Sequence, residues 1–181
     1  MRESQRLHRL VEGLLDFGRM EAGATQYRME SIDSTRLVHE IVAEFQREVD
    51  ERGYRVDLND VASAAVIRGD REALGRALWN LLDNAVRYSP DCRTVRVDLR
   101  RSETHLMFAV HDRGAGIPPE ERDMIFRKFA RGSAARATGA RGTGIGLAMV
   151  RHIVEGHKGT IHVESDPGTG TTFTVTVPLE R

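Results

Sequence analysis

Residues 3–22 carry apolar side chains at every third or fourth position, which is the spacing of one face of an α-helix. The stripe consists of Leu7, Leu10, Val11, Leu14, Leu15 and Phe17. A single helix cannot bury such a stripe by itself, so we expect it to pack against a partner helix from a second copy of the chain. Gly23 is placed to end this helix.

Two further helices are predicted from the same spacing and from the residues that flank them. One begins at Asp33 or Ser34, either of which can cap a helix N-terminus, and it ends at Gly53. The other is capped by Asp70 and stops before Pro90, because the residue before a proline disfavours helical backbone.

Apolar and polar residues alternate in several other stretches, which indicates strands with one buried face. The alternation is clearest over residues 95–100 and 106–110. The other expected elements are strands at 54–58 and 64–67 around a turn at Asn59–Asp60, an extended piece at 27–32, a helix at 144–155 and a final hairpin of strands 160–164 and 172–177. This order predicts an α/β (α+β) two-layer sandwich, in which a mixed β-sheet carries its helices on one face.

A long irregular stretch follows the strand that ends near Asp112. We expect it to hold one short helix, residues 119–129. Its end, residues 131–142, is small, basic and without apolar periodicity. A loop of this length inside a compact domain is usually a lid or a disordered segment.

The composition fits one globular domain with a short appendage. Of 181 residues, 40% are hydrophobic and 30% charged, and the formal net charge of +0 provides no overall field to recruit nucleic acid or an anionic membrane. Cys92 is the single cysteine, which excludes an intrachain disulfide and fits a reducing cytoplasm. No apolar run approaches the ~18 residues of a membrane span. We therefore expect a soluble, cytoplasmic chain, which remains compatible with a membrane-anchored parent protein.

The third helix carries a polar strip. At 3.6 residues per turn, Asn80, Asn84, Arg87 and Tyr88 lie along one edge, beside the apolar stripe. Asparagine is unfavourable inside a helix, so two of them at this spacing suggest a function that offsets the cost. Amide oxygens suit Mg²⁺, an arginine can neutralise phosphate, and a tyrosine can contact a nucleotide. The alternative is that the asparagines bond only to neighbouring backbone.

A glycine-rich turn begins at Asp112. This carboxylate can accept a hydrogen bond from an exocyclic amine such as that of adenine. Gly114 and Gly116 would let a ligand lie against the backbone. By itself the pattern also fits an ordinary loop, but the acidic residues that an EF-hand needs downstream are missing.

A second glycine-rich segment opens the helix at 144–155. It consists of Gly142, Thr143, Gly144, Ile145, Gly146 and Leu147. The free N–H groups and dipole of a helix start suit phosphate. The segment lacks the third glycine of a dinucleotide fingerprint, and the chain has no Gly-Lys-Ser/Thr ending of a Walker loop. A third segment, residues 168–173, fits a hairpin turn when taken alone.

Together and in this order, these segments resemble the Bergerat-fold ATPases, and within them the histidine kinases. The N, G1, F, G2 and G3 boxes of that family resemble residues 80–90, 112–117, 126–129, 142–147 and 168–173. The resemblance covers residues 30–179. Residues 3–23 also look like the second helix of a dimerisation and histidine-phosphotransfer domain. Together the two resemblances imply two units: residues 1–23 would come from the dimerisation domain, and residues 24–181 would form the ATP-binding catalytic domain.

The resemblance implies a role for each matched residue. Asn84 would coordinate Mg²⁺ with Asn80 supporting the site, and Arg87 and Arg131 would meet phosphate. Asp112 would bind the adenine amine. The other implied nucleotide contacts are Tyr88, Gly114, Gly116, Ile117, Gly142, Thr143, Gly144, Ile145, Gly146, Leu147 and Thr172. Phe126 and Phe129 would anchor the lid.

The implied function is transfer of the γ-phosphoryl group of Mg-ATP to a histidine on the dimerisation domain, for relay to the receiver domain of a response regulator. Relatives that hydrolyse ATP place a glutamate where this chain has Asn80, and an amide cannot act as a general base. None of the 7 histidines has the context of a phospho-acceptor, so the acceptor is expected on a region absent here, in a homodimeric parent. A serine kinase of the anti-sigma type and a scaffold that binds nucleotide without transfer are the open alternatives.

Overall fold

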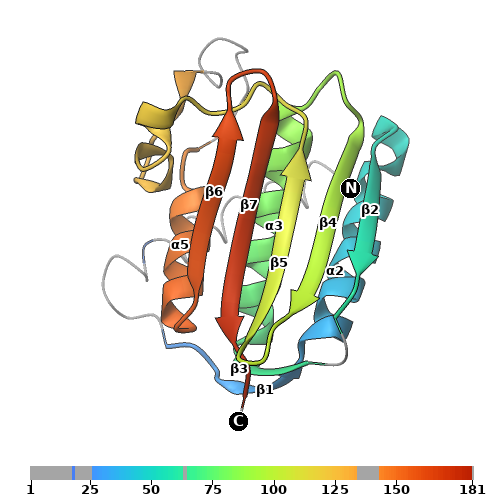
Figure 1. The fold of residues 1–181 in the computed structure, drawn as a ribbon, viewed down its shortest axis with the longest axis vertical. Helices are drawn as coiled ribbons and strands as arrows, with labels where there is room; N and C mark the ends of the chain where they lie inside the picture. Colours follow the sequence, from blue (N-terminus) through green and yellow to red (C-terminus); the bar gives the residue numbers. More distant parts are fainter. Residues whose placement is uncertain (1–17, 19–25, 63–64, 134–142, 181) are drawn as a thin grey trace.

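A mixed β-sheet forms one layer of the computed structural model, which describes residue 18 and residues 26–62, 65–133 and 143–180. The strand order is β2–β4–β5–β7–β6, with bounds Arg55–Asp60, Thr94–Arg101, His105–Asp112, Gly170–Pro178 and Thr160–Asp166. β2 pairs with β4 in parallel, and the other pairs are antiparallel. A separate antiparallel pair, β1 (Glu30–Asp33) and β3 (Val66–Gly69), lies at one end of the molecule (Figure 1).

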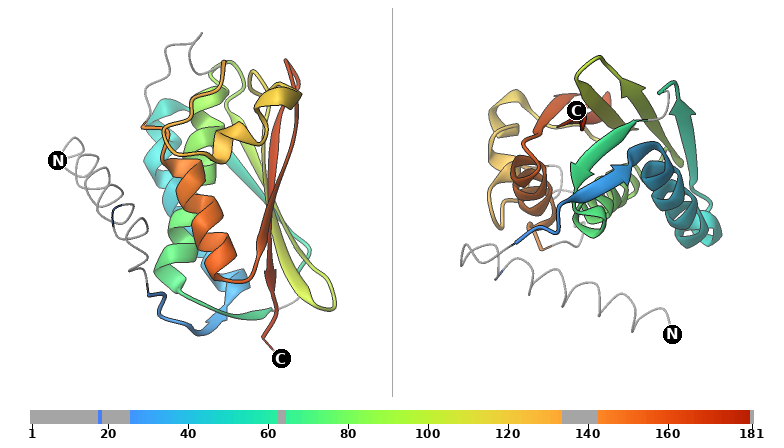
Figure 2. Two further views of the ribbon diagram at one scale, coloured as in Figure 1. Left: turned by 90° about the vertical axis from the view of Figure 1, so that its left-hand side faces the viewer. Right: turned by 90° about the horizontal axis from the view of Figure 1, so that it is seen from below.

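Three helices form the second layer. They are α2 (Ser34–Val49), α3 (Arg71–Tyr88) and α5 (Gly146–Gly156), and they cover the same face of the sheet (Figure 2). The predicted two-layer sandwich with helices on one face is therefore confirmed. The helix predicted over residues 3–22, with its domain boundary, lies outside the described residues. Among the described helices, none combines the length and the apolar character needed to cross a membrane.

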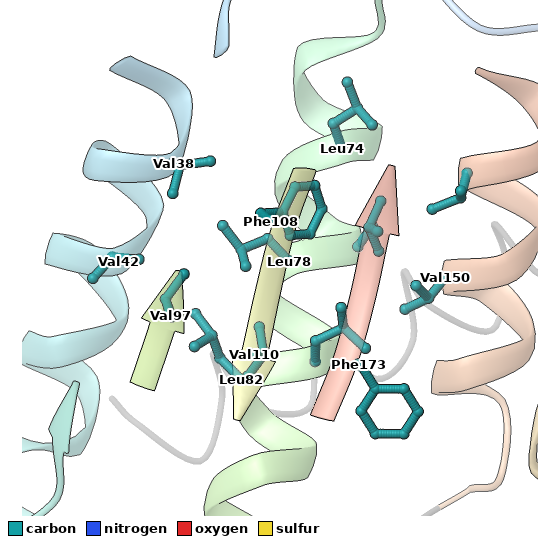
Figure 3. Close-up of a cluster of buried hydrophobic side chains, with 14 of the residues drawn as sticks. Val38, Val42, Leu74, Leu78, Leu82, Val97, Phe108, Val110, Val150 and Phe173 are labelled. Carbon is teal, nitrogen blue, oxygen red and sulfur yellow. The ribbon is translucent and has the colours of Figure 1, made fainter. Parts of the chain in front are cut away.

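The core lies between the sheet and α3. Val95, Val97 and Leu99 are all 0% exposed, as the alternation along β4 predicts. Figure 3 shows side chains of α2, α3, α5, β4, β5 and β7 meeting in one cluster, in which the labelled residues are Val38, Val42, Leu74, Leu78, Leu82, Val97, Phe108, Val110, Val150 and Phe173. Since α3 lies in the middle of the helical layer, it contributes to the core along most of its length.

The predicted helix ends are confirmed for α2 and α3. Asp33 accepts a hydrogen bond from Arg36 N–H at 3.0 Å, and Asp70 accepts one from Ala73 N–H at 2.9 Å. After α2 the chain makes one 3-10 turn, η1 (Asp50–Arg52), and then reverses at Gly53 with a φ of 71°. These caps satisfy N–H groups that the helices themselves cannot.

Two local predictions are wrong. Asn59 and Asp60 belong to β2 instead of forming a turn, because the parallel pairing with β4 continues to the end of that strand. The segment 119–129 forms two 3-10 turns, η2 (Pro119–Glu121) and η3 (Met124–Phe126), instead of one helix. Its groups are held by other elements: Arg122 donates to the carbonyl of Ser165, and the Phe126 ring lies edge-on to Phe173.

The N-terminus of α3 is also fixed from outside the helix. Nε2 of His157 accepts a hydrogen bond from Asp70 N–H at 2.8 Å, and its Nδ1 donates to Ile153 C=O at 2.6 Å. This pattern requires a neutral imidazole with the proton on Nδ1. The carboxylate of Asp70 additionally accepts from Arg28 N–H at 3.0 Å, so the segment before β1 is attached to the same point.

Replacing Asp70 by alanine is expected to lower the free energy of unfolding by about 1 kcal/mol at neutral pH, because α3 loses its cap. Burial alone would raise the pKa of Asp70, but hydrogen bonds from Ala73 and Arg28 N–H and the charge of Arg76 hold this pKa below its ordinary value. Because the pKa of Asp70 is lower in the folded protein, its ionisation stabilises the fold at pH values above the pKa of this group in the unfolded chain. This stabilisation is lost as the pH falls through the lowered pKa.

Denaturant unfolding of wild type, Asp70→Ala and Asp70→Asn, from neutral pH to about pH 3, measures both effects. Asparagine keeps a cap without a charge, so it should lose less stability than alanine at neutral pH. The difference in free energy of unfolding between wild type and Asp70→Asn should become smaller as the pH is lowered. Equal stability of all three proteins at neutral pH would contradict the capping role.

Candidate functional site

Three segments of the predicted site meet at one end of the molecule. They are the C-terminal half of α3, the end of β5 with the following loop, and the start of α5. Figure 1 shows these ends together with the β6–β7 hairpin, opposite the β1–β3 pair. The tertiary structure thus brings together segments that are far apart in the sequence.

The carboxylate of Asp112 is the best-defined group of the site. Its Oδ1 accepts hydrogen bonds from Gly114 N–H at 2.8 Å, Ser89 Oγ at 3.2 Å and Thr171 N–H at 3.2 Å. Within the described part of the chain, Oδ2 has no hydrogen-bond donor. One oxygen is therefore held in place by the protein, and the other is available to a ligand.

The environment of Asp112 opposes its charge. Burial raises the pKa of this carboxyl above its ordinary value, although the donors from Gly114, Ser89 and Thr171 act in the other direction. Ionisation of Asp112 therefore costs folding stability as the pH rises through the raised pKa. A side chain kept at such a cost is a candidate for function.

The loop after Asp112 fits tightly against two neighbours. Ala115 N–H donates to the Tyr88 carbonyl at 3.4 Å, and a Cβ on Gly114 would lie 2.2 Å from that same oxygen. Gly116 has a φ of 72°, and a Cβ there would lie 2.0 Å from the carbonyl oxygen of Asp166. Both glycines are required for close approach of backbone to backbone.

The polar strip of α3 lies on the half-buried edge of the helix, as predicted. Asn80 Nδ2 donates to the Arg76 carbonyl at 2.9 Å, and its Oδ1, next to Gly146, accepts no hydrogen bond from the described part of the chain. Among the described residues, the side chain of Asn84 has no hydrogen-bond partner. Arg87 is paired with Asp83, one turn before it, so an anion at this edge would compete with Asp83 for the guanidinium.

The second glycine segment forms the start of α5 without a side-chain cap. Gly144 has a φ of 70°, Ile145 is buried, and Thr143 is exposed. Uncapped N–H groups at the start of an 11-residue helix point toward the site and suit an anion. Gly142 lies outside the described residues, while Gly146 and Leu147 form the first turn of the helix.

The segment with the two phenylalanines is attached to this helix start. Phe129 N–H donates to the Gly144 carbonyl at 3.0 Å, and a Cβ on Gly144 would lie 2.8 Å from the Phe129 backbone. Phe129 has a positive φ of 58° and is 64% exposed. Arg131 is half-buried and precedes Ser133, whose N–H donates to the Glu121 carboxylate at 2.9 Å.

The two threonines at the start of β7 face opposite sides of the sheet. Thr171 lies beside Asp112, whereas the hydroxyl of Thr172 contacts Nδ1 of His111 at 2.9 Å on the face without helices. The family resemblance implied a role for Thr172, whereas the residue beside Asp112 is Thr171. The alternation of residues along β7 could have identified Thr171, because it shares its face with the buried Phe173 and Val175.

Ser89 was missed for a different reason. It is 1% exposed, and its hydroxyl donates to Asp112 while its carbonyl accepts from Tyr54 Oη–H at 3.2 Å. In the sequence it is only the residue between the polar strip and Pro90. Nothing in the local pattern indicates that it reaches β5.

Known proteins match this chain over most of its length. Residues 69–181 match the family described as histidine kinase-, DNA gyrase B-, and HSP90-like ATPase. The chain belongs to this family. Because this is a family of ATPases, ATP is the nucleotide of the domain. The named relatives of the chain are sensor histidine kinases.

Among these relatives, the sensor-like histidine kinase SenX3 of Mycobacterium bovis is 37% identical over 176 residues, which cover 97% of this chain and 43% of SenX3. The sensor protein SrrB of Staphylococcus aureus is 33% identical over 97% of this chain and 30% of its own length. The chain thus spans less than half the length of these curated relatives. A solved structure of the mycobacterial sensor histidine kinase MprB matches 84% of this chain and 98% of its own, with a TM-score of 0.68 and 29% identity.

Alanine at Gly114 is expected to weaken ATP binding at least about tenfold, because its Cβ must push the loop away from the Tyr88 carbonyl. Gly168→Ala is the matched control, since Gly168 has a φ of 80° but nothing within 4 Å of an added Cβ. It should cost only about 1 kcal/mol of stability from the left-handed backbone. Calorimetric titration with ATP distinguishes the two; equal affinity losses would show that the close approach at Gly114 is unimportant.

Proposed function

We propose that this ATPase domain binds Mg-ATP and donates the γ-phosphoryl group to a histidine of a sensor kinase. The observation that carries the proposal is the carboxylate of Asp112, with Oδ1 held by three donors and Oδ2 left for a ligand. An acceptor oriented in this way suits the exocyclic amine of adenine. It would reject guanine, which carries a carbonyl at the corresponding position.

The rest of the nucleotide would extend from Asp112 toward α3 and α5. Tyr88, Gly114, Gly116, Ile117 and Thr171 would line the base. The phosphates would meet the N–H groups of residues 143–147, together with Arg87 after it exchanges Asp83 for phosphate. Arg131 is a further candidate phosphate ligand, because it follows Phe129, whose N–H donates to the Gly144 carbonyl near the start of α5.

The residues present on α3 fit a magnesium ion. The Asn84 amide makes no hydrogen bond within the described residues, and the Asn80 amide has its nitrogen engaged and its oxygen free. Mg²⁺ prefers oxygen ligands and keeps several waters and phosphate oxygens. Asn84 would hold the ion directly, and Asn80 would support it. When bound, the ion would neutralise charge on the phosphates.

The expected reaction is phosphoryl transfer rather than hydrolysis. A neutral imidazole nitrogen of the acceptor would form a bond to the γ-phosphorus as the bond to the β,γ-bridging oxygen breaks and ADP leaves. The imidazole N–H proton would pass to solvent. Asn80 cannot take a proton from water, so this chain positions the triphosphate and balances its charge without activating a nucleophile.

The acceptor histidine and the further partners follow from the same proposal. The acceptor would lie on the dimerisation domain that residues 3–23 resemble in sequence, in a homodimeric parent protein. The phosphoryl group would then pass to an aspartate on the receiver domain of a response regulator.

A separate helix that carries a phospho-acceptor histidine should be labelled by this chain with γ-labelled ATP, whereas labelling of a serine substrate instead would favour the serine-kinase alternative.

Asp112→Asn tests the adenine contact. The amide oxygen can replace Oδ1, but the amide nitrogen would then face the adenine amine, donor against donor. We expect ATP affinity to fall about a hundredfold or more, while stability at neutral pH stays equal or rises, because the variant cannot ionise. Calorimetry and thermal unfolding measure the two effects. Retained ATP affinity would refute the assignment of Asp112.

Asn84→Ala tests the metal contact. Removing the amide oxygen should abolish the gain in ATP affinity that Mg²⁺ provides, about tenfold or more, and leave metal-free ATP binding unchanged. Asn84→Asp is the matched variant, because a carboxylate still offers oxygen ligands. Titrations with Mg²⁺ and with a chelator measure the gain. An undiminished Mg²⁺ effect in Asn84→Ala would exclude Asn84 as a ligand.

A further inference from the structure

The hydroxyl of Ser165 lies at a buried junction that no box of the family includes. Ser165 belongs to β6 and is 8% exposed. Its Oγ accepts a hydrogen bond from Ile117 N–H at 2.8 Å, donates to the Gly170 carbonyl at 2.8 Å and lies 3.0 Å from the hydroxyl oxygen of Thr171. One side chain thus connects the loop after β5 with the start of β7.

The direction of each hydrogen bond follows from the groups involved. A serine hydroxyl has one hydrogen, and the Gly170 carbonyl can only accept, so the Ser165 hydrogen points to Gly170. The Thr171 hydroxyl must then donate to Ser165 Oγ. Thr171 therefore has its own hydrogen engaged, and its oxygen retains only acceptor capacity toward the site.

Both residues joined by Ser165 lead directly to Asp112. Thr171 N–H is one of the three donors to Asp112 Oδ1. Ile117 lies at the end of the loop that contains Gly114, and Gly114 N–H is a second donor to Asp112 Oδ1. Loss of the Ser165 hydroxyl would remove the acceptor of Ile117 N–H and the side-chain donor to the Gly170 carbonyl. The two segments that donate to Asp112 would then be held less firmly.

The segment between η2 and η3 is attached to the same residue. Arg122 Nη2 donates to the Ser165 carbonyl and lies 3.1 Å from the Asp166 carboxylate. The Gly168 N–H donates to the Ala115 carbonyl at 2.8 Å, which closes the contact between the β6–β7 hairpin and the loop. The hydroxyl is therefore the central polar contact among three elements that surround Asp112.

We propose that Ser165 is a positioning residue for adenine recognition, which acts by orienting Asp112 and Thr171 through its hydroxyl. This inference rests on the proposed contact between Asp112 and the adenine amine. Ser165 itself does not touch the nucleotide. Its effect should consequently depend on the amine and not on the triphosphate.

The test compares ATP with purine riboside triphosphate, which lacks the exocyclic amine, by calorimetric titration of wild type, Ser165→Ala and Ser165→Cys. In wild type, ATP should bind at least about tenfold more tightly than the analogue. In Ser165→Ala, ATP affinity should fall about tenfold and affinity for the analogue should change less than about twofold. Ser165→Cys fills the same space with a weak hydrogen-bonding group, so it should lose the same discrimination even if the alanine variant does not fold.

Ser102→Ala is the matched control, because Ser102 lies between β4 and β5, at the other end of β5 from Asp112, and its hydroxyl bonds to Thr104 and His105 and to no other described residue. It should keep wild-type affinity for both nucleotides. If the Ser165 variants weaken both nucleotides equally, or leave the discrimination intact, Ser165 has no role in adenine recognition. If wild type itself does not discriminate, the proposed contact of Asp112 fails, and the inference fails with it.

Discussion

The packing of α3 against the sheet is the central contact of the molecule. Its buried face meets β4, β5 and both neighbouring helices, and it includes Leu74, Leu78, Leu81, Leu82 and Ala85. Once that face is buried, the helical period leaves only one edge for Asn80 and Asn84. The cap at Asp70, held from outside by His157, fixes the helix along its axis. The polar strip is thus positioned by apolar contacts, although no apolar group takes part in its chemistry.

Asp112 shows what this framework makes possible. A half-buried carboxylate is unfavourable, and its raised pKa measures that cost. Three donors offset part of it, and they come from the end of α3, from the loop after β5 and from β7. Because these donors are separated by many residues in the chain, the acceptor exists only in the folded protein. Within the residues that the structure describes, Oδ2 accepts no hydrogen bond, so this oxygen is left for a ligand.

The fold was predictable where short-range patterns are strong. Alternation placed β4 and β5, and the caps Asp33 and Asp70 placed two helix starts, because a cap bonds to backbone within a few residues. Segment 119–129 was not predictable in this way. Its composition permits a helix, but Arg122 and Phe126 bond and pack to β6 and β7, and those contacts favour two separate turns.

The family, the two-layer architecture and the candidate residue types of the site could be inferred from the chain alone, since periodicity, caps and glycine-rich segments are local properties. Which of these residues meet depends on the folded arrangement. Thr171 rather than Thr172 lies beside Asp112 because of the register between β5 and β7, and Ser89 and Ser165 join the site through contacts across 23 and 48 residues. Long-range hydrogen bonds of this kind leave no pattern in the chain, because their partners are selected by packing and not by neighbouring residues.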